Sequence, residues 1–487
     1  MPATTRIPLL RDPLLGVYLF LLVGFLLPAR LIVGPLGGVG APATLIALGV
    51  AVAYAVARLL PGALADGTQP VRTALLAFAA VTVLGYGVGL ARTLLAVEAA
   101  SMDRALVASV GYIGLALVVA DGVRSRAHLD RLLRLLVVGG VLLSAMGILQ
   151  FVTGLTPDTY LRVPGLQMQD VTVNASRSFL TRVMGTTLHP IEYGVVLAVI
   201  LPFALHYATT SRDGLRPSRW WWVAAGMIVV GIPMSVSRSS ILGIAVGGVI
   251  LAMAWGWRRR VNLVVAGLLM LVAMRAAFPG LLGTLKSYFF AFGKDPSIEG
   301  RTQDYPVAWQ YIQERPWLGR GLGTFPPEAY FYLDNEYLNR ILTGGVIGLA
   351  VLIALLLVAM GTARGVFHHA ADQTSRALGQ ALTASIAVTA FTWFTYDGLA
   401  FRLAAGVGFI TIGAAGALWR LEVGHRRWGT DVDHTRPEIV LAPRPRRSGD
   451  LDHRLDDDPL GVDLAHDRDL DAVAPADRVP VGARSRA

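Results

Sequence analysis

The segment EGRTQDYPVAWQYIQERPWLGRGLGTFPPEAYFYLDNEYLNRILTGGVIGL, residues 299–349, decides the fold, because it is polar and aromatic yet lies between long apolar runs. Its Gly-rich turn is followed by an acid and an amide, Asp334 and Asn335, and then directly by another apolar run. This order is typical of a structured loop that rests on a bilayer surface and continues into a membrane-spanning helix. We therefore expect a membrane protein whose candidate site lies in this loop.

The composition is that of a polytopic membrane protein. The chain has 487 residues, 54% of them hydrophobic, and a mean hydropathy of +0.55, which soluble domains do not reach. The absence of cysteine excludes disulfides, thiolate catalysis and Cys-ligated metals. The net charge of +10 comes mostly from arginines in short loops between apolar runs, where arginine orients membrane spans, so we expect no nucleic-acid partner.

Apolar runs recur along the chain at the length of membrane spans. A helical span needs about 20 apolar residues, and about twelve runs meet this requirement. We predict an all-α polytopic integral membrane protein with about 12 transmembrane helices and a large extracytoplasmic loop between spans 9 and 10. The predicted spans are 13–33, 41–60, 72–92, 104–120, 133–153, 190–209, 220–236, 239–256, 261–278, 341–361, 378–396 and 401–420.

The distribution of arginine in the loops predicts the topology. One set of alternate loops carries arginine clusters such as 258–260, whereas the short loops of the other set, such as 34–40, have almost no positive charge. Positively charged loops remain on the cytoplasmic side of a membrane. We therefore expect both termini in the cytoplasm and the two long loops, 154–189 and 279–340, on the extracytoplasmic side.

The chain divides into a membrane domain and a tail. Residues 1–423 are expected to form the transmembrane domain of a plasma or inner membrane protein. Its run 13–33 is too long for the apolar part of a cleavable signal, and we interpret it as a first span. Residues 424–487 are rich in Asp, Arg and Pro and nearly free of aromatics, so we expect a disordered cytoplasmic tail.

The long loop 279–340 is expected to contain a helix and a tight turn. Residues 304–314 place apolar and aromatic side chains among polar neighbours, which suits an amphipathic helix at the membrane interface. Pro316 ends this helix, and the three glycines that follow, Gly319, Gly321 and Gly323, permit a tight turn that exposes the backbone.

Four arginines near the outer ends of the predicted spans are candidates to bind an anion; they are Arg182, Arg238, Arg301 and Arg320. A guanidinium group binds phosphate through two parallel hydrogen bonds and remains charged, so four on one face would match a pyrophosphate. The alternatives are that Arg238 snorkels towards water and that Arg301 and Arg320 are solvated loop residues.

His189 and Glu192 lie where the sixth predicted span begins. An acid in this position is a candidate functional residue, although a structural pair with a nearby arginine explains it equally well. The dipeptide from His189 to Pro190 also suits the start of a helix, because proline is favoured in the first turn. Asp397 and Arg402 bracket the last outer loop, where we interpret them as an ion pair or a topological feature.

Asp334 and Asn335 immediately precede the tenth predicted span. Both residues are favoured helix caps, and Asp334 is also placed to act as a general base towards an acceptor hydroxyl. Glu328 and Glu336 are the competing acids.

Three segments together resemble the O-antigen ligase and O-antigen polymerase superfamily. The first is RVMGTTLHPIEYG at 182–194, and the second is SVSRSSILG at 235–243. The third and most specific, at 300–349, contains GR, ERPWLGRGLGTF, DNEYL and GGVIGL in that order. The likeness covers the core region 180–360, and the remaining spans agree with the family only in number.

The resemblance implies an enzyme of polysaccharide assembly, a glycosyltransferase that acts on the extracytoplasmic face by inversion, without a metal or cofactor. The donor would be a glycan on a polyprenyl pyrophosphate in the membrane lipid, and the acceptor a hydroxyl of a glycan or a lipid. By motif, Arg238 and Arg301 would hold the pyrophosphate, and Asp334 would be the base at the position where the family carries histidine. The residues expected to bind substrate are Arg182, His189, Glu192, Arg320 and Asn335.

Three alternatives to this interpretation remain, and the first of them belongs to another class of protein. A transporter or flippase of lipid-linked oligosaccharide also has about twelve spans, but no clear repeat relates the two halves of this chain. A polyprenyl-phosphate-sugar transferase of another fold usually has an acidic pair in its first outer loop, and 34–40 contains no acid. A catalytically inactive relative that serves as an assembly partner would explain Asp334 in place of histidine.

Overall fold

The computed structural model describes residues 12–169, 176–177, 180–210, 218–277 and 296–424. Within these ranges the chain is almost entirely helical, and its only strands are two antiparallel pairs of two residues each. These are β1 (Leu31–Ile32) with β2 (Gln167–Met168), and β3 (Ser176–Arg177) with β4 (Leu180–Thr181). Part of the predicted outer loop, 278–295, and the predicted tail from residue 425 lie outside the described residues.

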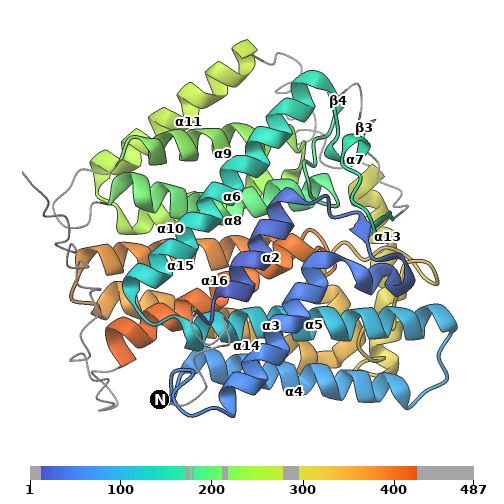
Figure 1. Cartoon of the computed structure of the whole chain (residues 1–487). Helices are drawn as coiled ribbons and strands as arrows, with labels where there is room; N and C mark the ends of the chain where they lie inside the picture. The colour runs from blue at the N-terminus through green and yellow to red at the C-terminus, as the bar shows by residue number, and fades with distance from the viewer. Residues whose placement is uncertain (1–11, 170–175, 178–179, 211–217, 278–295, 425–487) are drawn as a thin grey trace, which may run out of the picture. The chain divides into compact units, whose positions relative to one another are not determined.

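Each predicted span coincides with a helix of the structure (Figure 1). These helices are α2 (Leu15–Leu26), α3 (Pro42–Arg58), α4 (Pro70–Leu90), α5 (Ala96–Gly122), α6 (Arg126–Thr153), α8 (Pro190–Thr209), α9 (Trp220–Met234), α10 (Arg238–Ala254), α11 (Trp257–Ala277), α14 (Glu336–His369), α15 (Gln373–Thr392) and α16 (Arg402–Trp419). The remaining helices α7 (Pro157–Tyr160) and α13 (Pro296–Glu314) fall in the two predicted outer loops.

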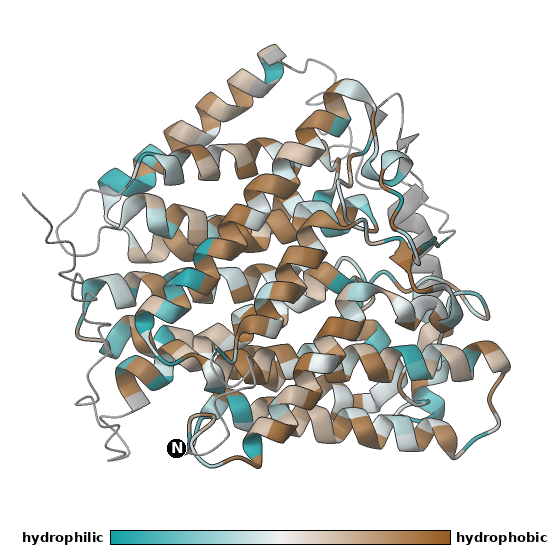
Figure 2. Cartoon of the chain, viewed as in Figure 1, coloured by the Kyte–Doolittle hydropathy of each residue, from teal (hydrophilic) through white to brown (hydrophobic). Residues whose placement is uncertain are grey.

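Six helices are long and apolar enough to cross a membrane: α4, α5, α6, α8, α14, and α16 with its continuation to Val423. A seventh span results if α3 is joined with the short helix η2 (Gly34–Gly40) across a bend of 70°, while α2, α9 and α10 are apolar but shorter. Figure 2 shows hydrophobic residues along the helices and hydrophilic residues gathered towards their ends. The chain is a mostly helical integral membrane protein, and the number of twelve spans stays a prediction.

The helices α8 and α16 form the centre of the membrane domain. In their span windows 89% and 94% of the residues are buried, the highest shares among the candidate spans. Helix α16 packs against α5, α14, α15 and α8, and α8 packs against α9, α10, α15 and α6. At the periphery, α11 exposes apolar side chains such as Leu268, Leu269 and Val272, which suits contact with lipid.

Helix α14 is interrupted at Gly345, whose φ of 65° and ψ of −168° are not helical. The segment between α13 and α14 inserts its backbone at this break. The amides of Arg320 and Gly321 donate to the carbonyls of Leu342 and Thr343, at 3.0 and 2.9 Å. The amide of Val346 donates to the carbonyl of Pro316 at 2.8 Å. The hydrogen bonds that α14 lacks at the break are therefore replaced by the loop.

Only glycine fits position 345, because a Cβ atom there would collide with the backbone of Trp317. The predicted tight turn is also confirmed, since Gly319, Gly321 and Gly323 have φ values of 68°, 114° and 65°. The predicted interfacial helix forms the last part of α13, which ends at Glu314. The turn and the first residues of α14 thus form one hydrogen-bonded unit.

Candidate active site where α5, α14 and α16 begin

A cavity of about 510 Å³ lies where α5, α14 and α16 begin. Its lining comes from five separate parts of the chain: residues 38–44, 101–112, 322–334, 336–343 and 397–402, with Gln169 in addition. The charged residues of the lining are Arg104, Glu328, Asp334, Glu336, Arg340, Asp397 and Arg402. Acids and arginines that are far apart in the sequence therefore face one space.

Two carboxyl groups, those of Glu336 and Asp397, are in contact at this cavity. Glu336 is buried, and its Oε2 accepts a hydrogen bond of 3.2 Å from the backbone N–H of Leu399. Asp397 forms hydrogen bonds with the side chains of Glu336 and Asn339. Burial, and then the neighbouring Glu336 carboxylate, raise the pKa of Asp397 well above its usual range. The Asp397 carboxyl therefore favours its protonated form more strongly than an exposed aspartate does.

Arg340 lies one helical turn after Glu336 and compensates the charge of the carboxyl pair. Its Nη2 is 3.2 Å from Oε1 of Glu336, and the guanidinium lies 5.4 Å from the ring centroid of Phe78. The side chain is buried, and its Nε has no hydrogen-bond partner among the described residues. A buried donor without a partner is costly, so this N–H is available for an oxygen of a bound substrate.

Asn335, and not Asp334, caps helix α14. Asn335 is the N-cap of α14, since its Oδ1 accepts from the amides of Tyr337 and Leu338 at 3.0 and 3.2 Å. Asp334 lines the cavity, whereas Asn335 does not. Helix capping therefore does not require Asp334, which is one of the acids that line the cavity.

Glu192 connects the beginnings of α8 and α16. Its carboxylate is fully buried and accepts hydrogen bonds from the amides of Leu188, Leu403 and Ala404, at 2.8, 2.8 and 3.3 Å. It does not belong to the lining of the cavity. These contacts support a structural role for Glu192, in which its carboxylate holds backbone amides of two chain segments together.

His189 is the N-cap of α8 and contacts a residue that lines the cavity. Its Nδ1 accepts a hydrogen bond of 3.1 Å from the amide of Ile191, as expected for a residue that starts a helix. Its ring lies 5.8 Å from the ring of Phe401, which lines the cavity. His189 therefore supports the wall of the cavity through Phe401.

Arg182 contacts the turn that precedes Arg238 and α10. Arg182 is buried, and its Nε donates to the carbonyl of Ser235 at 3.1 Å. Arg238 is the first residue of α10, and neither arginine lines the cavity. Between them Val236 has a φ of 47°, which a β-branched residue rarely adopts. Strained backbone concentrates at functional sites, so this turn is a candidate for a second part of the site.

Arg320 does not line the cavity; it connects the glycine-rich turn at 319–323 to helix α5. Its Nη2 donates to the hydroxyl of Tyr330 at 2.8 Å and lies 3.8 Å from the carboxylate of Glu98. Glu98 also accepts hydrogen bonds from Tyr330 at 2.7 Å and from Arg92 at 2.6 Å. The guanidinium of Arg320 lies 4.7 Å from the ring centroid of Tyr311. Arg301 falls in α13, and its side chain lies outside the described residues.

Arg340 is not among the site residues predicted from the sequence, where Asp397 is interpreted as part of an ion pair or as a topological feature. A signal for Arg340 exists in the sequence, because Glu336 and Arg340 are four residues apart on one helix. No such signal exists for Asp397, whose contact with Glu336 depends on how α14, α15 and α16 pack.

Residues 223–353 match the family described as O-antigen ligase. The matched region includes α10, the tight turn and the cavity-lining part of α14. No curated protein matches the chain. The match confirms the resemblance to the O-antigen ligase and polymerase superfamily, and with the long apolar helices it supports an enzyme of ligase or polymerase type in polysaccharide assembly.

Proposed function

We propose that the chain transfers a glycan from a polyprenyl pyrophosphate to an acceptor hydroxyl at the cavity, on the extracytoplasmic face of the membrane. The observation that carries this proposal is that Asp334, the Glu336–Asp397 pair and Arg340 line one cavity, and that all of them except Asp397 belong to the segment that matches the O-antigen ligase family. A cavity of about 510 Å³ has room for sugar units between a base and cationic donors.

In the proposed reaction Asp334 takes the proton of the acceptor hydroxyl. The hydroxyl oxygen forms a bond to the anomeric carbon from the face opposite the leaving group, which inverts the configuration. The bond between this carbon and the pyrophosphate oxygen breaks, and the negative charge remains on the pyrophosphate. Arg340 donates its Nε–H to an oxygen of the reacting groups. Arginines stabilise the charge that develops on the leaving group.

By the resemblance, Arg238 and Arg301 hold the pyrophosphate, and Arg182 assists. The strained turn at Val236, just before Arg238, supports a functional role of this segment. The polyprenyl tail remains among the apolar helices, so the donor joins the site from the bilayer.

Arg238→Ala and Arg301→Ala are each expected to lower glycan transfer by about 10²–10³, because a charge-assisted contact that strengthens in the transition state is lost. Lysine at either position should also give slow glycan transfer, since an ammonium group cannot bind two oxygens in the bidentate manner of guanidinium. Transfer is measured with purified protein and a polyprenyl-pyrophosphate-linked oligosaccharide. Near wild-type transfer by either Ala variant would remove that arginine from the mechanism.

The same assay tests the function itself. Incubation with the lipid-linked oligosaccharide alone should give a ladder of longer glycans if the chain is a polymerase, and addition of a second lipid acceptor should give one product if it is a ligase. Movement of the oligosaccharide across proteoliposomes without a new glycosidic bond would instead indicate a flippase. An absence of both activities would indicate an assembly partner without catalysis.

The proposed orientation predicts which residues an impermeant thiol reagent reaches. The chain contains no cysteine, so single cysteines are unambiguous. Tyr332 and Leu59 are exposed, at 76% and 83% of their surface. Tyr332 lines the cavity together with Gly38, just before α3 begins, whereas Leu59 follows the other end of α3. Tyr332→Cys should be labelled in intact cells, and Leu59→Cys only after permeabilisation. The reverse pattern would contradict the orientation.

A further inference from the structure

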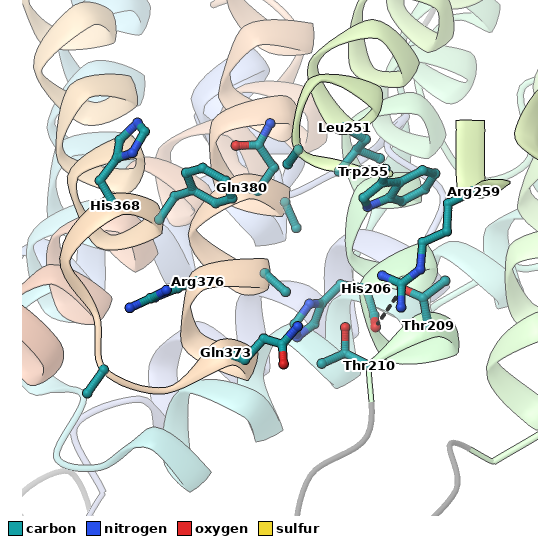
Figure 3. Close-up of a pocket in the computed structure, with 15 residues that line it drawn as sticks. His206, Thr209, Thr210, Leu251, Trp255, Arg259, His368, Gln373, Arg376 and Gln380 are labelled. Atoms are coloured by element: carbon teal, nitrogen blue, oxygen red, sulfur yellow. Dashed lines mark hydrogen bonds between the residues drawn. The ribbon is translucent and has the colours of Figure 1, made fainter. Parts of the chain in front are cut away.

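A second cavity, of about 490 Å³, lies at the ends of α8 and α14 that are remote from the candidate active site (Figure 3). It is enclosed by the last residues of α8, α10 and α14 and by the first residues of α11 and α15. Its polar lining consists of His206, Thr209, Thr210, Arg259, His368, Gln373, Arg376 and Gln380. No role in the proposed transfer reaction involves this end of the helices.

The charged residues in the lining of this cavity are all arginines. Arg259 of α11 and Arg376 of α15 both line it, and Figure 3 shows them on opposite sides of His206 and Gln373. None of the described lining residues is Asp or Glu. Nε of Arg376 donates to the carbonyl of Ala370 at 2.6 Å, which leaves its terminal nitrogens for other partners. Two arginines in a lining that contains no carboxylate favour an anionic ligand, and guanidinium matches the geometry of phosphate oxygens in particular.

His206 is independent evidence that the cavity binds a ligand. Its side chain is 7% exposed, and its Nδ1 is buried without a hydrogen-bond partner among the residues that the structure describes. The ring is held in place by an edge contact with Tyr207, with 5.0 Å between the ring centroids. Buried polar atoms in native proteins have partners, so the imidazole indicates a polar group of a ligand in this cavity.

The remaining wall of the cavity is apolar. Leu251, Trp255 and Phe367 line it together with several alanines. Nearby, Val249 and Met253 of α10 expose apolar side chains on the surface of the membrane domain. A site that combines arginines with apolar side chains next to a lipid-facing helix suits an amphiphile with an anionic head, and basic pockets between membrane helices bind such head groups.

We propose that this cavity binds a phosphate group, held by Arg259, Arg376 and His206, and that it is a site separate from the one for glycan transfer. Phosphate oxygens accept hydrogen bonds from both guanidinium groups and from the imidazole N–H. The same chemistry is presented by the head group of an anionic phospholipid and by free phosphate. The apolar wall beside Trp255 accommodates the glycerol and first acyl carbons when the phosphate belongs to a lipid.

The test measures lipid binding to the purified full-length chain by native mass spectrometry. Dioleoylphosphatidylglycerol is the anionic probe, and dioleoylphosphatidylcholine is the zwitterionic comparison. We expect one phosphatidylglycerol to bind about tenfold or more tightly than phosphatidylcholine. Arg259→Gln combined with Arg376→Gln should weaken this binding about tenfold or more, because charge-assisted hydrogen bonds are lost. Competition by inorganic phosphate would assign the site to the free anion, and its failure would assign it to the lipid head group.

Arg258→Gln is the matched control, because Arg258 is also exposed at the start of α11 but does not line the cavity. It should bind phosphatidylglycerol as the wild type does. His206→Phe keeps the ring that contacts Tyr207 and removes both nitrogens, so it tests the site even if the double variant does not fold. Equal binding of the two lipids by the wild type, or wild-type binding by the folded double variant and by His206→Phe, would overturn the proposal.

Discussion

Asp334→Asn is expected to lower the rate of glycan transfer by about 10²–10⁴ while the protein folds normally, since a general base contributes a factor of this size. Asparagine has nearly the same shape as aspartate but cannot accept the proton of the acceptor hydroxyl. The fold should tolerate the change because Asn335, and not Asp334, caps α14. The rate is measured with the purified variant and the lipid-linked oligosaccharide, and folding by thermal unfolding in detergent.

Two variants serve as controls for this result. Asp334→His should recover part of the activity, because imidazole accepts the same proton. Asn335→Ala removes the cap and should cost about 0.5–2 kcal/mol of stability, but it should retain transfer. If Asp334→Asn is as active as the wild type, Asp334 is not the base, and the role passes to the Glu336–Asp397 pair, Glu328 or His189.

Arg340→Met is expected to affect both transfer and stability. Transfer should fall by about 10²–10³, because a cationic donor next to the reacting groups is lost. The protein should also lose about 3–5 kcal/mol of stability, the usual cost when one partner of a buried ion pair is removed. The Glu336 carboxylate would remain buried without its arginine. Both quantities are measured on the same purified variant.

A double variant separates the two effects of Arg340. Glu336→Gln together with Arg340→Met removes the buried pair and should regain much of the stability, because no uncompensated charge remains. Its transfer activity should stay low if Arg340 acts on the substrate. Recovery of transfer together with stability would show that Arg340 acts only by holding the fold, and it would remove this residue from the proposed reaction.

The helices could be predicted from the sequence because each depends on local hydropathy. Every predicted span coincides with a helix, and the predicted turn has the positive φ values that its glycines permit. The break in α14 could not be predicted, since GGVIGL continues the apolar run without interruption. The non-helical geometry at Gly345 arises only when the backbone of residues 316–321 approaches from the loop.

The candidate site was only partly predictable for the same reason. Asp334 and Asn335 stand out locally because they precede an apolar run, and only the fold shows that Asn335 caps the helix while Asp334 lines the cavity. The sequence predicts that Arg320 binds substrate, and only the fold shows that Arg320 contacts Glu98, which belongs to the distant helix α5. Long-range packing, which no local pattern encodes, decides these roles.

The break at Gly345 also determines the depth of Glu336 and Arg340 relative to the hydrocarbon core of the membrane. A continuous helix from Glu336 to His369 would be about 51 Å long at 1.5 Å per residue, whereas the hydrocarbon core is about 30 Å thick. The part after the break is about 36 Å long and spans this core by itself. The first turns, with Glu336 and Arg340, then project into the interfacial layer. In the proposed orientation, the break at Gly345 therefore places these charged residues at the membrane surface. There an acceptor sugar in water can reach a donor whose polyprenyl chain remains in the bilayer.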